Sequence, residues 1–200
     1  MKKILVIDNY DSFVYNLVHY LEEFEVHVDV VRNKSIDLDK VEQYDKILLS
    51  PGPGIPDEAG QLKELIKSYY KTKPVLGVCL GQQAIMEVFD GTLNNLKQVY
   101  HGIATPIDIT VDDEPLYKGL SKTIEVGRYH SWVVNKDLPE ELEATSFDKE
   151  GNIMSLRHRV YDLRAVQFHP ESVLTKDGKT MIKNWVEAPY PESSGPQGRL

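Results

Sequence analysis

Residues 74–86 read Pro-Val-Leu-Gly-Val-Cys-Leu-Gly-Gln-Gln-Ala-Ile-Met, and this stretch decides the fold. The apolar run at 75–78 predicts a buried strand, and the residues from 81 to 89 predict a helix. Gly77 and Gly81 flank Cys79, the only cysteine of the chain, where the strand must turn sharply into the helix. This arrangement is similar to a nucleophile elbow with sulfur in place of the usual serine oxygen. It predicts covalent attack of a thiol on a carbonyl group.

Strands and helices alternate on the N-terminal side of this stretch. Residues 4–7 and 47–49 are short, continuous apolar runs, as expected of strands that are covered on both faces. Apolar residues at helical spacing follow at 13–24 and 62–69, and a half-exposed strand is expected at 26–30. The alternation predicts an α/β fold, with an open, mostly parallel sheet and helices on both faces.

Short β patterns dominate the second half of the chain. The expected strands are 107–111, 123–126, 142–147, 152–156 and 163–168, and a last helix is expected at 180–186. We therefore expect a single domain over residues 1–187 with a β-rich second half. The remaining residues, 188–200, are rich in Pro and Gly and are expected to form a disordered tail.

Composition narrows the class of protein. The chain has 200 residues, of which 41% are hydrophobic and 27% are charged, as is ordinary for a globular protein. Its net charge of -8 argues against nucleic acid as a partner, because phosphate binding needs clustered Lys and Arg. No apolar run approaches the roughly 18 residues of a membrane span, so no membrane partner is expected. A single cysteine fits a reducing compartment, and we expect the protein in the cytoplasm.

Polar and reactive residues are expected at one edge of the sheet. The carboxyl ends of parallel strands meet at the same edge, where α/β proteins bind their ligands. Asp8, the segment 50–54 and Cys79 each follow a predicted strand, and His169 follows the strand expected at 163–168. These residues should therefore lie close together.

A cysteine nucleophile needs a base that takes its proton and a third group that orients the base. His169 and Glu171 offer both, with a proline between them that restrains the chain. An oxyanion formed in the reaction also needs backbone donors. The N–H of Leu80, which follows the nucleophile, is one. The second is Gly52 or Gly54, because the prolines of that segment have no N–H.

Each of these signals also has a simpler structural interpretation. A buried cysteine is commonly a small core residue, a histidine before a proline is commonly structural, and a Pro-Gly-Pro-Gly segment is commonly a tight turn. The glycines beside Cys79 favour the catalytic interpretation. No cluster of His, Cys, Asp and Glu has the spacing of metal ligands, so no cofactor is expected in this chain.

Four segments together are similar to a known family. They are 8–13 (Asp-Asn-Tyr-Asp-Ser-Phe), 50–54 (Ser-Pro-Gly-Pro-Gly), 77–81 (Gly-Val-Cys-Leu-Gly) and 167–172 (Gln-Phe-His-Pro-Glu-Ser). In their order and spacing, the chain resembles a class I, triad-type glutamine amidotransferase from residue 4 to about 186. More narrowly, it resembles anthranilate synthase component II and the p-aminobenzoate synthase glutaminase subunit, because the first two segments are typical of the chorismate-linked branch.

This resemblance implies a flavodoxin-like fold and a mechanism. Cys79 would attack the carboxamide of L-glutamine, which gives a glutamyl thioester and ammonia. His169 would shuttle the proton and Glu171 would orient it, while Gly52 and Leu80 would bind the oxyanion.

The resemblance also implies binding residues and a partner. The residues that would hold glutamine are Pro51, Gly52, Pro53, Gln83, Ser131 and Trp132. Ammonia would pass to a larger chorismate-binding synthase subunit in a hetero-oligomer, and this partner subunit is expected to need Mg2+. We expect anthranilate synthesis. The alternatives are 4-amino-4-deoxychorismate (p-aminobenzoate) synthesis, or one subunit that serves both.

Two positions depart from the family's usual pattern. Gln82 stands where the family usually has His, and Ile103 follows Gly102 where it usually has Lys. Ile103 removes a cation near a segment that the family uses at its subunit contact, which leaves the details of partner recognition open. Two hypotheses of another class stand beside the glutaminase: a non-catalytic interaction domain, and an elbow-cysteine hydrolase of another family.

Overall fold

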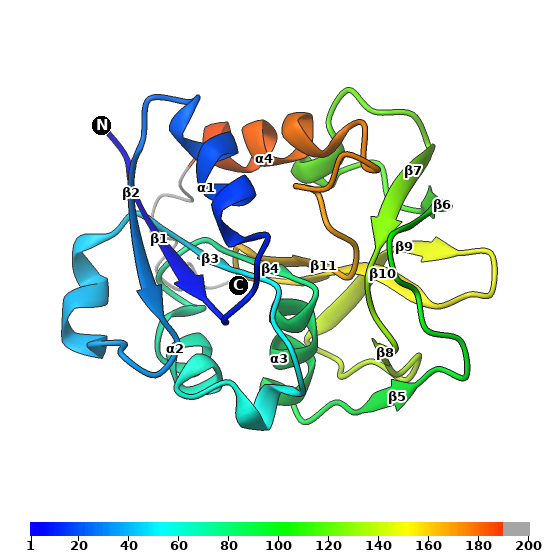
Figure 1. Cartoon of the computed structure of the whole chain (residues 1–200), viewed down its shortest axis with the longest axis horizontal. Coiled ribbons are helices and arrows are strands. Elements are labelled where there is room, and N and C mark those ends of the chain that lie inside the picture. Colours follow the sequence, from blue (N-terminus) through cyan, green and yellow to red (C-terminus); the bar gives the residue numbers. More distant parts are fainter. Residues whose placement is uncertain (190–200) are drawn as a thin grey trace, which may run out of the picture.

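A nine-stranded mixed sheet forms the centre of the protein in a computed structural model that describes residues 1–189 (Figure 1). The strands of this sheet are β1 (Lys3–Asp8), β2 (His27–Arg32), β3 (Lys46–Leu49), β4 (Val75–Val78), β6 (Ile103–Ile109), β7 (Thr123–Arg128), β9 (Leu142–Asp148), β10 (Ile153–His158) and β11 (Leu163–Val166). Their order is β2-β1-β3-β4-β11-β10-β9-β6-β7. The strands from β2 to β11 pair in parallel, and those from β11 to β7 pair antiparallel. The β-rich second half therefore extends the sheet of the first half.

Helices cover both faces of the parallel part, as the sequence predicts. α1 (Val14–Glu22) and α4 (Gly178–Glu187) lie on one face, and α2 (Leu62–Tyr69) and α3 (Leu80–Val88) lie on the other (Figure 1). Alternate residues of each strand supply the two cores. In β1, Ile4 and Val6 pack in the layer of α1 and α4, whereas Leu5 and Ile7 pack in the layer of α2 and α3. Within residues 1–189, no helix is long and apolar enough to cross a membrane.

Most predicted elements are present with shifted ends. The strand at 75–78 is correct, but the strand expected at 163–168 ends at Val166. The chain leaves β4 there, because the N–H of His169 bonds to the carbonyl of Gly127 in β7. The helices expected at 13–24, 81–89 and 180–186 span 14–22, 80–88 and 178–187, and the strand expected at 107–111 spans 103–109. The strands expected at 26–30, 123–126 and 152–156 span 27–32, 123–128 and 153–158, and the other predicted strands differ by at most one residue at either end. The tail expected at 188–200 lies outside the described residues beyond Pro189.

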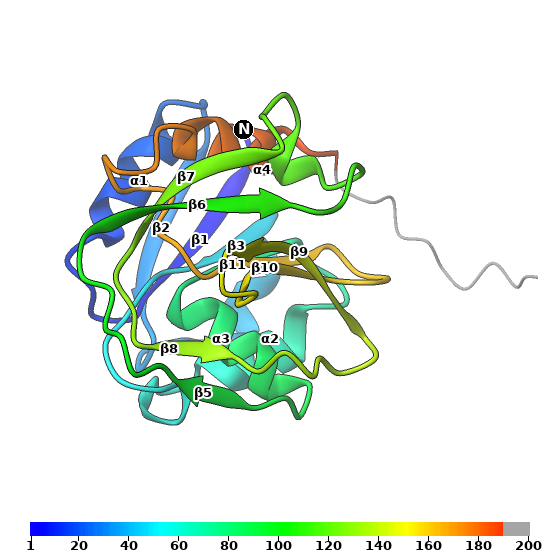
Figure 2. The same ribbon diagram turned by 90° about the vertical axis from the view of Figure 1, so that its right-hand side faces the viewer.

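A second, two-stranded sheet escaped the sequence analysis. β5 (Leu93–Asn95) and β8 (Trp132–Val134) pair antiparallel beside α3 (Figure 2). Strands of three residues are too short for an alternating pattern to be recognised. This small sheet places Trp132 next to the helix that follows Cys79.

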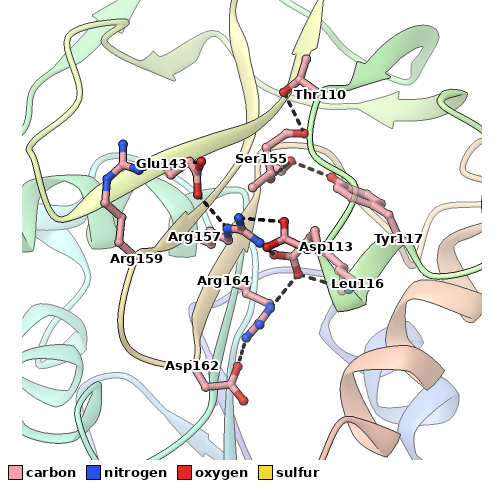
Figure 3. A network of polar contacts seen from close by, with 12 residues as sticks. Thr110, Asp113, Leu116, Tyr117, Glu143, Ser155, Arg157, Arg159, Asp162 and Arg164 are labelled. Carbon is pink, nitrogen blue, oxygen red and sulfur yellow. Dashed lines mark hydrogen bonds and ion pairs between the residues drawn. The ribbon is translucent and has the colours of Figure 1, made fainter. Parts of the chain in front are cut away.

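Charged side chains cover the junction between the parallel and antiparallel parts of the sheet. Arg157 of β10 and Arg164 of β11 are register partners, so two like charges lie side by side. Figure 3 shows Arg157 and Arg164 with their polar contacts. The buried carboxylate of Glu114 accepts a hydrogen bond from Arg164 Nε at 2.6 Å and lies 3.5 Å from Arg157 Nη1. Asp113 and Glu143 each accept from Arg157 at 2.9 Å. The network neutralises the arginines and ties the segment of Glu114 to the sheet.

Candidate active site

Cys79 lies at the sharp turn between β4 and α3. Its backbone has φ 54° and ψ −100°, a left-handed conformation that costs a non-glycine residue about 1–3 kcal/mol. The flanking glycines do not carry this strain. Instead they allow close packing: a Cβ on Gly77 would lie 2.8 Å from the carbonyl carbon of Gly81, and a Cβ on Gly81 would lie 3.0 Å from Leu49. The elbow is therefore built as predicted, with the strain on the cysteine itself.

His169 and Glu171 reach the same sheet edge as Cys79. β11 pairs in parallel with β4, so the segment after β11 emerges beside the elbow. The His169 Nδ1 and Glu171 Oε1 atoms are 2.7 Å apart, and both side chains are buried. A carboxylate accepts only, so Nδ1–H donates to it and Nε2 faces away from the pair. The structure thus brings together the three predicted triad residues.

The charge state of His169 follows from its neighbours. Burial alone lowers the pKa of His169, but the Cys79 sulfur and the Glu171 carboxylate act in the opposite direction and raise its pKa to about 11. Its Nε2 atom makes no hydrogen bond of ordinary geometry within residues 1–189, so Cys79 acts on it through proximity and charge. The arrangement favours an imidazolium at His169, and a cation beside the sulfur is the setting in which a cysteine reacts as a nucleophile.

Backbone contacts hold the segment of the triad in place. The Thr175 hydroxyl donates to the carbonyl of His169 at 2.7 Å and accepts from the N–H of Gly127 at 2.8 Å. Gly178, the first residue of α4, approaches so closely that a Cβ there would lie 1.7 Å from the carbonyl oxygen of Pro170. The start of α4 therefore supports the peptide between His169 and Glu171.

Two aromatic rings flank the imidazole of His169. The ring of Tyr129 lies 4.8 Å away, and that of Phe13 lies 5.7 Å away in an edge-on orientation. The Tyr129 hydroxyl is 3.0 Å from the Ser172 hydroxyl, which fixes the tyrosine. These contacts exclude water from one side of the imidazole and limit its rotation. Phe13 belongs to the first of the four segments, which had no assigned role.

The segment 50–54 lies against the elbow. A Cβ on Gly52 would lie 2.8 Å from the side chain of Leu80 and 2.6 Å from that of Asn9, so the two predicted oxyanion donors are neighbours. Gly54 is exposed and packs on Glu58 instead, which favours Gly52 as the second donor. Asn9 fixes this segment: its N–H donates to the Ser50 hydroxyl at 2.9 Å and its side-chain amide donates to the Ser50 carbonyl at 2.8 Å.

The expected glutamine-binding residues are partly brought together. The side-chain amide of Gln83 donates to the carbonyl of Trp132 at 3.1 Å, and both Ser131 and Trp132 are half-buried. Pro51 is buried behind the oxyanion segment. Pro53 is exposed and lines a cavity of about 260 Å³ together with Asn9, Tyr10 and Leu80, among other residues.

A buried polar network behind Trp132 was missed by the sequence analysis. Arg128 is fully buried, pairs with Asp148 at 2.9 Å, and donates from Nε to His130 Nε2 at 3.0 Å. His130 Nδ1 lies 3.0 Å from the carbonyl of Trp132. Burial and the charge of Arg128 lower the pKa of His130 to about 3, so it stays neutral. The sequence analysis reached this part of the chain only through the family resemblance, which implied a role for Ser131 and Trp132. Its polar side chains carried no periodic signal of burial.

The two departures from the family pattern lie in different environments. Gln82 is fully buried, and neither side-chain atom has a hydrogen-bond partner in the described part of the chain. Ile103 is exposed at 42%, next to the loop that carries His101 and Gly102. Across residues 1–189, no group of three or more His, Cys, Asp or Glu side chains is placed to hold a metal ion.

The sequence from residue 5 to 188 matches the family "Glutamine amidotransferase class-I". The chain belongs to this family. The geometry of its elbow and of the His169–Glu171 pair is therefore found in a protein of the expected class.

Relatives of known name are similar over almost the whole chain. The chain is 44% identical to the aminodeoxychorismate/anthranilate synthase component 2 of Bacillus subtilis, over 92% of this chain and 95% of the relative. It is 42% identical to the aminodeoxychorismate synthase component 2 of Escherichia coli, over 92% and 98%. It is 41% identical to the anthranilate synthase component 2 of Pseudomonas aeruginosa, over 92% and 94%.

Solved structures confirm the fold. A protein of Thermoplasma acidophilum, described as a candidate GMP synthase subunit, superposes with a TM-score of 0.84 at 26% identity. The superposition covers 93% of this chain and 92% of that one. The predicted α/β fold of a class I glutamine amidotransferase is thus confirmed.

Proposed function

We propose that this amidotransferase is the glutaminase subunit of a chorismate-aminating synthase, with Cys79, His169 and Glu171 as its catalytic triad. One observation carries the proposal. Cys79 and His169 follow neighbouring parallel strands, β4 and β11, and His169 is oriented by Glu171 at 2.7 Å. A structural cysteine has no need of a strained backbone beside an imidazole–carboxylate pair.

The first half of the reaction forms a thioester. The Cys79 thiolate attacks the side-chain amide carbon of L-glutamine, and the carbonyl oxygen becomes an oxyanion. The N–H groups of Gly52 and Leu80 stabilise this oxyanion. When the intermediate collapses, the C–N bond breaks and the imidazolium of His169 gives its proton to the departing nitrogen, so that ammonia leaves.

The second half of the reaction restores the enzyme. His169, now neutral, takes a proton from water, and the resulting hydroxide attacks the thioester carbon. The C–S bond then breaks, glutamate leaves and the thiolate forms again beside the imidazolium. Glu171 keeps the imidazole in the tautomer that presents Nε2 throughout. Gln83 and the backbone of Ser131 and Trp132 hold the amino-acid end of the substrate.

The ammonia is delivered to a larger synthase subunit that aminates chorismate. Relatives at 41–44% identity carry both aminodeoxychorismate and anthranilate names, and one carries both. Our preference is anthranilate synthesis in the cytoplasm, with 4-amino-4-deoxychorismate synthesis, or service to both, as the alternative. Because hydrolysis without an acceptor wastes glutamine, the isolated chain should hydrolyse it weakly.

Two experiments test the proposal. In the complex with its synthase subunit, Cys79→Ser should abolish glutamine-dependent product formation and leave ammonia-dependent formation intact. Survival of the glutamine-dependent reaction would refute the triad. Mixing the wild-type chain with each candidate synthase subunit, chorismate, Mg2+ and glutamine then decides the pathway. Support of aminodeoxychorismate formation without anthranilate formation would overturn our preference.

A further inference from the structure

The orientation of a buried hydrogen-bond chain can be read from Arg128 to Cys79. An arginine guanidinium only donates, so His130 Nε2 must accept from Arg128 Nε and must be unprotonated. In a neutral imidazole the proton then lies on Nδ1. His130 Nδ1–H therefore donates to the carbonyl of Trp132 at 3.0 Å.

The same carbonyl fixes the amide of Gln83. A backbone carbonyl only accepts, so the Gln83 atom that lies 3.1 Å from Trp132 O must be the nitrogen. This nitrogen is also 3.3 Å from a side-chain atom of Gln167. Because an NH2 group donates, the Gln167 atom that faces it must be the oxygen, Oε1.

The side-chain nitrogen of Gln167 then faces Cys79. Gln167 is fully buried, and its Nε2 atom lies 3.5 Å from the Sγ atom of Cys79, within the range of an N–H···S hydrogen bond. The orientation of the Gln167 amide follows from the Trp132 carbonyl, which can only accept a hydrogen bond. It does not depend on an arbitrary assignment of the amide oxygen and nitrogen. The contact is thus a donor that points at the sulfur.

We propose that Gln167 is a catalytic residue that donates a hydrogen bond to the Cys79 thiolate, and that Gln83 positions it. The inference rests on the proposed function for the role of the sulfur as nucleophile. A donor at this place stabilises the charged sulfur on a side that does not take up the proton. His169 can then transfer its proton to the leaving nitrogen while the sulfur stays held.

This assignment gives Gln83 a second task. Its amide nitrogen is shared between the Trp132 carbonyl, at the expected substrate-binding segment, and Gln167, at the nucleophile. A change at the Trp132 carbonyl can therefore displace Gln167, and a change at Gln167 can displace Trp132, through these two hydrogen bonds. Positions 83 and 167 act as one unit, and their substitutions should be non-additive.

The test is the pH profile of Cys79 alkylation by iodoacetamide in the full-length chain. Cys79 is the only cysteine, so all label belongs to it. In Gln167→Met, which keeps the side-chain volume without a donor, the midpoint should rise by about one pH unit, a tenfold change in proton affinity. In Gln167→Glu, which keeps the shape but places a negative charge beside the sulfur, it should rise further. If Gln167 had a purely structural role, the midpoints of the two variants would not follow the polarity of the new side chain.

Gln82→Met is the matched control. Gln82 is also a fully buried glutamine, on the helix that carries Gln83, but it makes no hydrogen bond to a described residue. Its midpoint should equal that of the wild type. An alkylation midpoint equal to that of the wild type in a folded Gln167 variant overturns the inference. If Gln167→Met shows no cooperative unfolding and so is not folded, the result of Gln167→Glu is used. If the Gln167 variants raise the midpoint but the wild-type protein hydrolyses no glutamine with any partner, the proposed function is refuted and the hydrogen bond to Cys79 is not.

Discussion

Replacing Gly178 by alanine tests whether α4 holds the triad in register. The new Cβ would lie 1.7 Å from the carbonyl oxygen of Pro170 and 2.6 Å from its carbonyl carbon. Pro170 joins His169 to Glu171, and these contacts are with backbone atoms that cannot rotate away. The peptide between the side chains of His169 and Glu171 must therefore move, or α4 must.

The size of the movement follows from the distance. Cβ atoms do not approach other heavy atoms within 3.0 Å, so the two segments must separate by at least 1.3 Å, the difference between 3.0 Å and 1.7 Å. A displacement of about 1 Å in a catalytic group costs on the order of 100-fold in rate. Overpacking costs about 1–3 kcal/mol of stability, and the better helix propensity of alanine returns up to about 1 kcal/mol. The rate should therefore suffer more than the fold.

Two measurements separate these effects. In complex with the synthase subunit, Gly178→Ala should lower glutamine-dependent kcat/KM about 100-fold, whereas ammonia-dependent turnover should be retained. Thr180→Ala, an exposed change in the same turn of α4, is the control and should match the wild type in both assays. Urea unfolding reports the stability of each variant. Full glutamine-dependent activity in Gly178→Ala would show that the close approach to Pro170 does not position the triad.

The remaining predictions concern stability. Burial lowers the pKa of His130 to about 3, so between pH 6.5 and 3 the unfolded chain binds a proton at this position and the folded chain does not. The free energy of unfolding should therefore fall by about 1.4 kcal/mol per pH unit as the pH drops from 6.5 toward 3. His130→Gln should flatten this slope in urea titrations. Burial lowers the pKa of Lys46 to about 8, so wild-type stability relative to Lys46→Met should rise by about 1.4 kcal/mol per unit between pH 8 and 10.5. Parallel profiles of variant and wild type would contradict either prediction. Thr175→Val should lower the free energy of unfolding by about 1–3 kcal/mol, since the buried N–H of Gly127 loses its acceptor; an unchanged urea midpoint would contradict it.

The parallel half of the fold was readable from the sequence because its signals are local. The run 75–78 is short and apolar on both faces, which is typical of a strand covered by two layers. The helices α1 and α2 showed their apolar spacing directly. The proposed triad residues were placed by the same reasoning, because residues that follow the strands of one parallel sheet lie at the same edge.

The antiparallel half was harder, for a physical reason. The runs at 142–147 and 152–156 indicated strands, but nothing local shows whether they form a separate sheet or extend the first one. That depends on pairing between distant segments, such as Ser155 with Val166 in β10 and β11. Glu114, which contacts both Arg157 and Arg164, is likewise more than forty residues away from them in the sequence.

The finer parts of the site depend on orientation, which a sequence does not carry. Gln167 stood inside a recognised segment and His130 directly precedes Ser131, yet their contacts depend on which amide atom or ring nitrogen faces which neighbour. Gly77 and Gly81 were interpreted as the residues of the sharp turn. In the structure they are spacers for close packing, and the left-handed backbone belongs to Cys79.

The position of β11 between β4 and β10 sets the order of events during synthesis. β4 is complete at residue 78, but its neighbour on one side spans 163–166, so this edge stays open until most of the chain has left the ribosome. His169 and Glu171 arrive only with that strand. The thiol of a nascent chain is therefore without its proposed base while the sheet is unfinished, and the proposed catalytic centre is complete only after β11 has closed the gap in the sheet. A pairing that spans nearly ninety residues makes this step slow relative to the local elements.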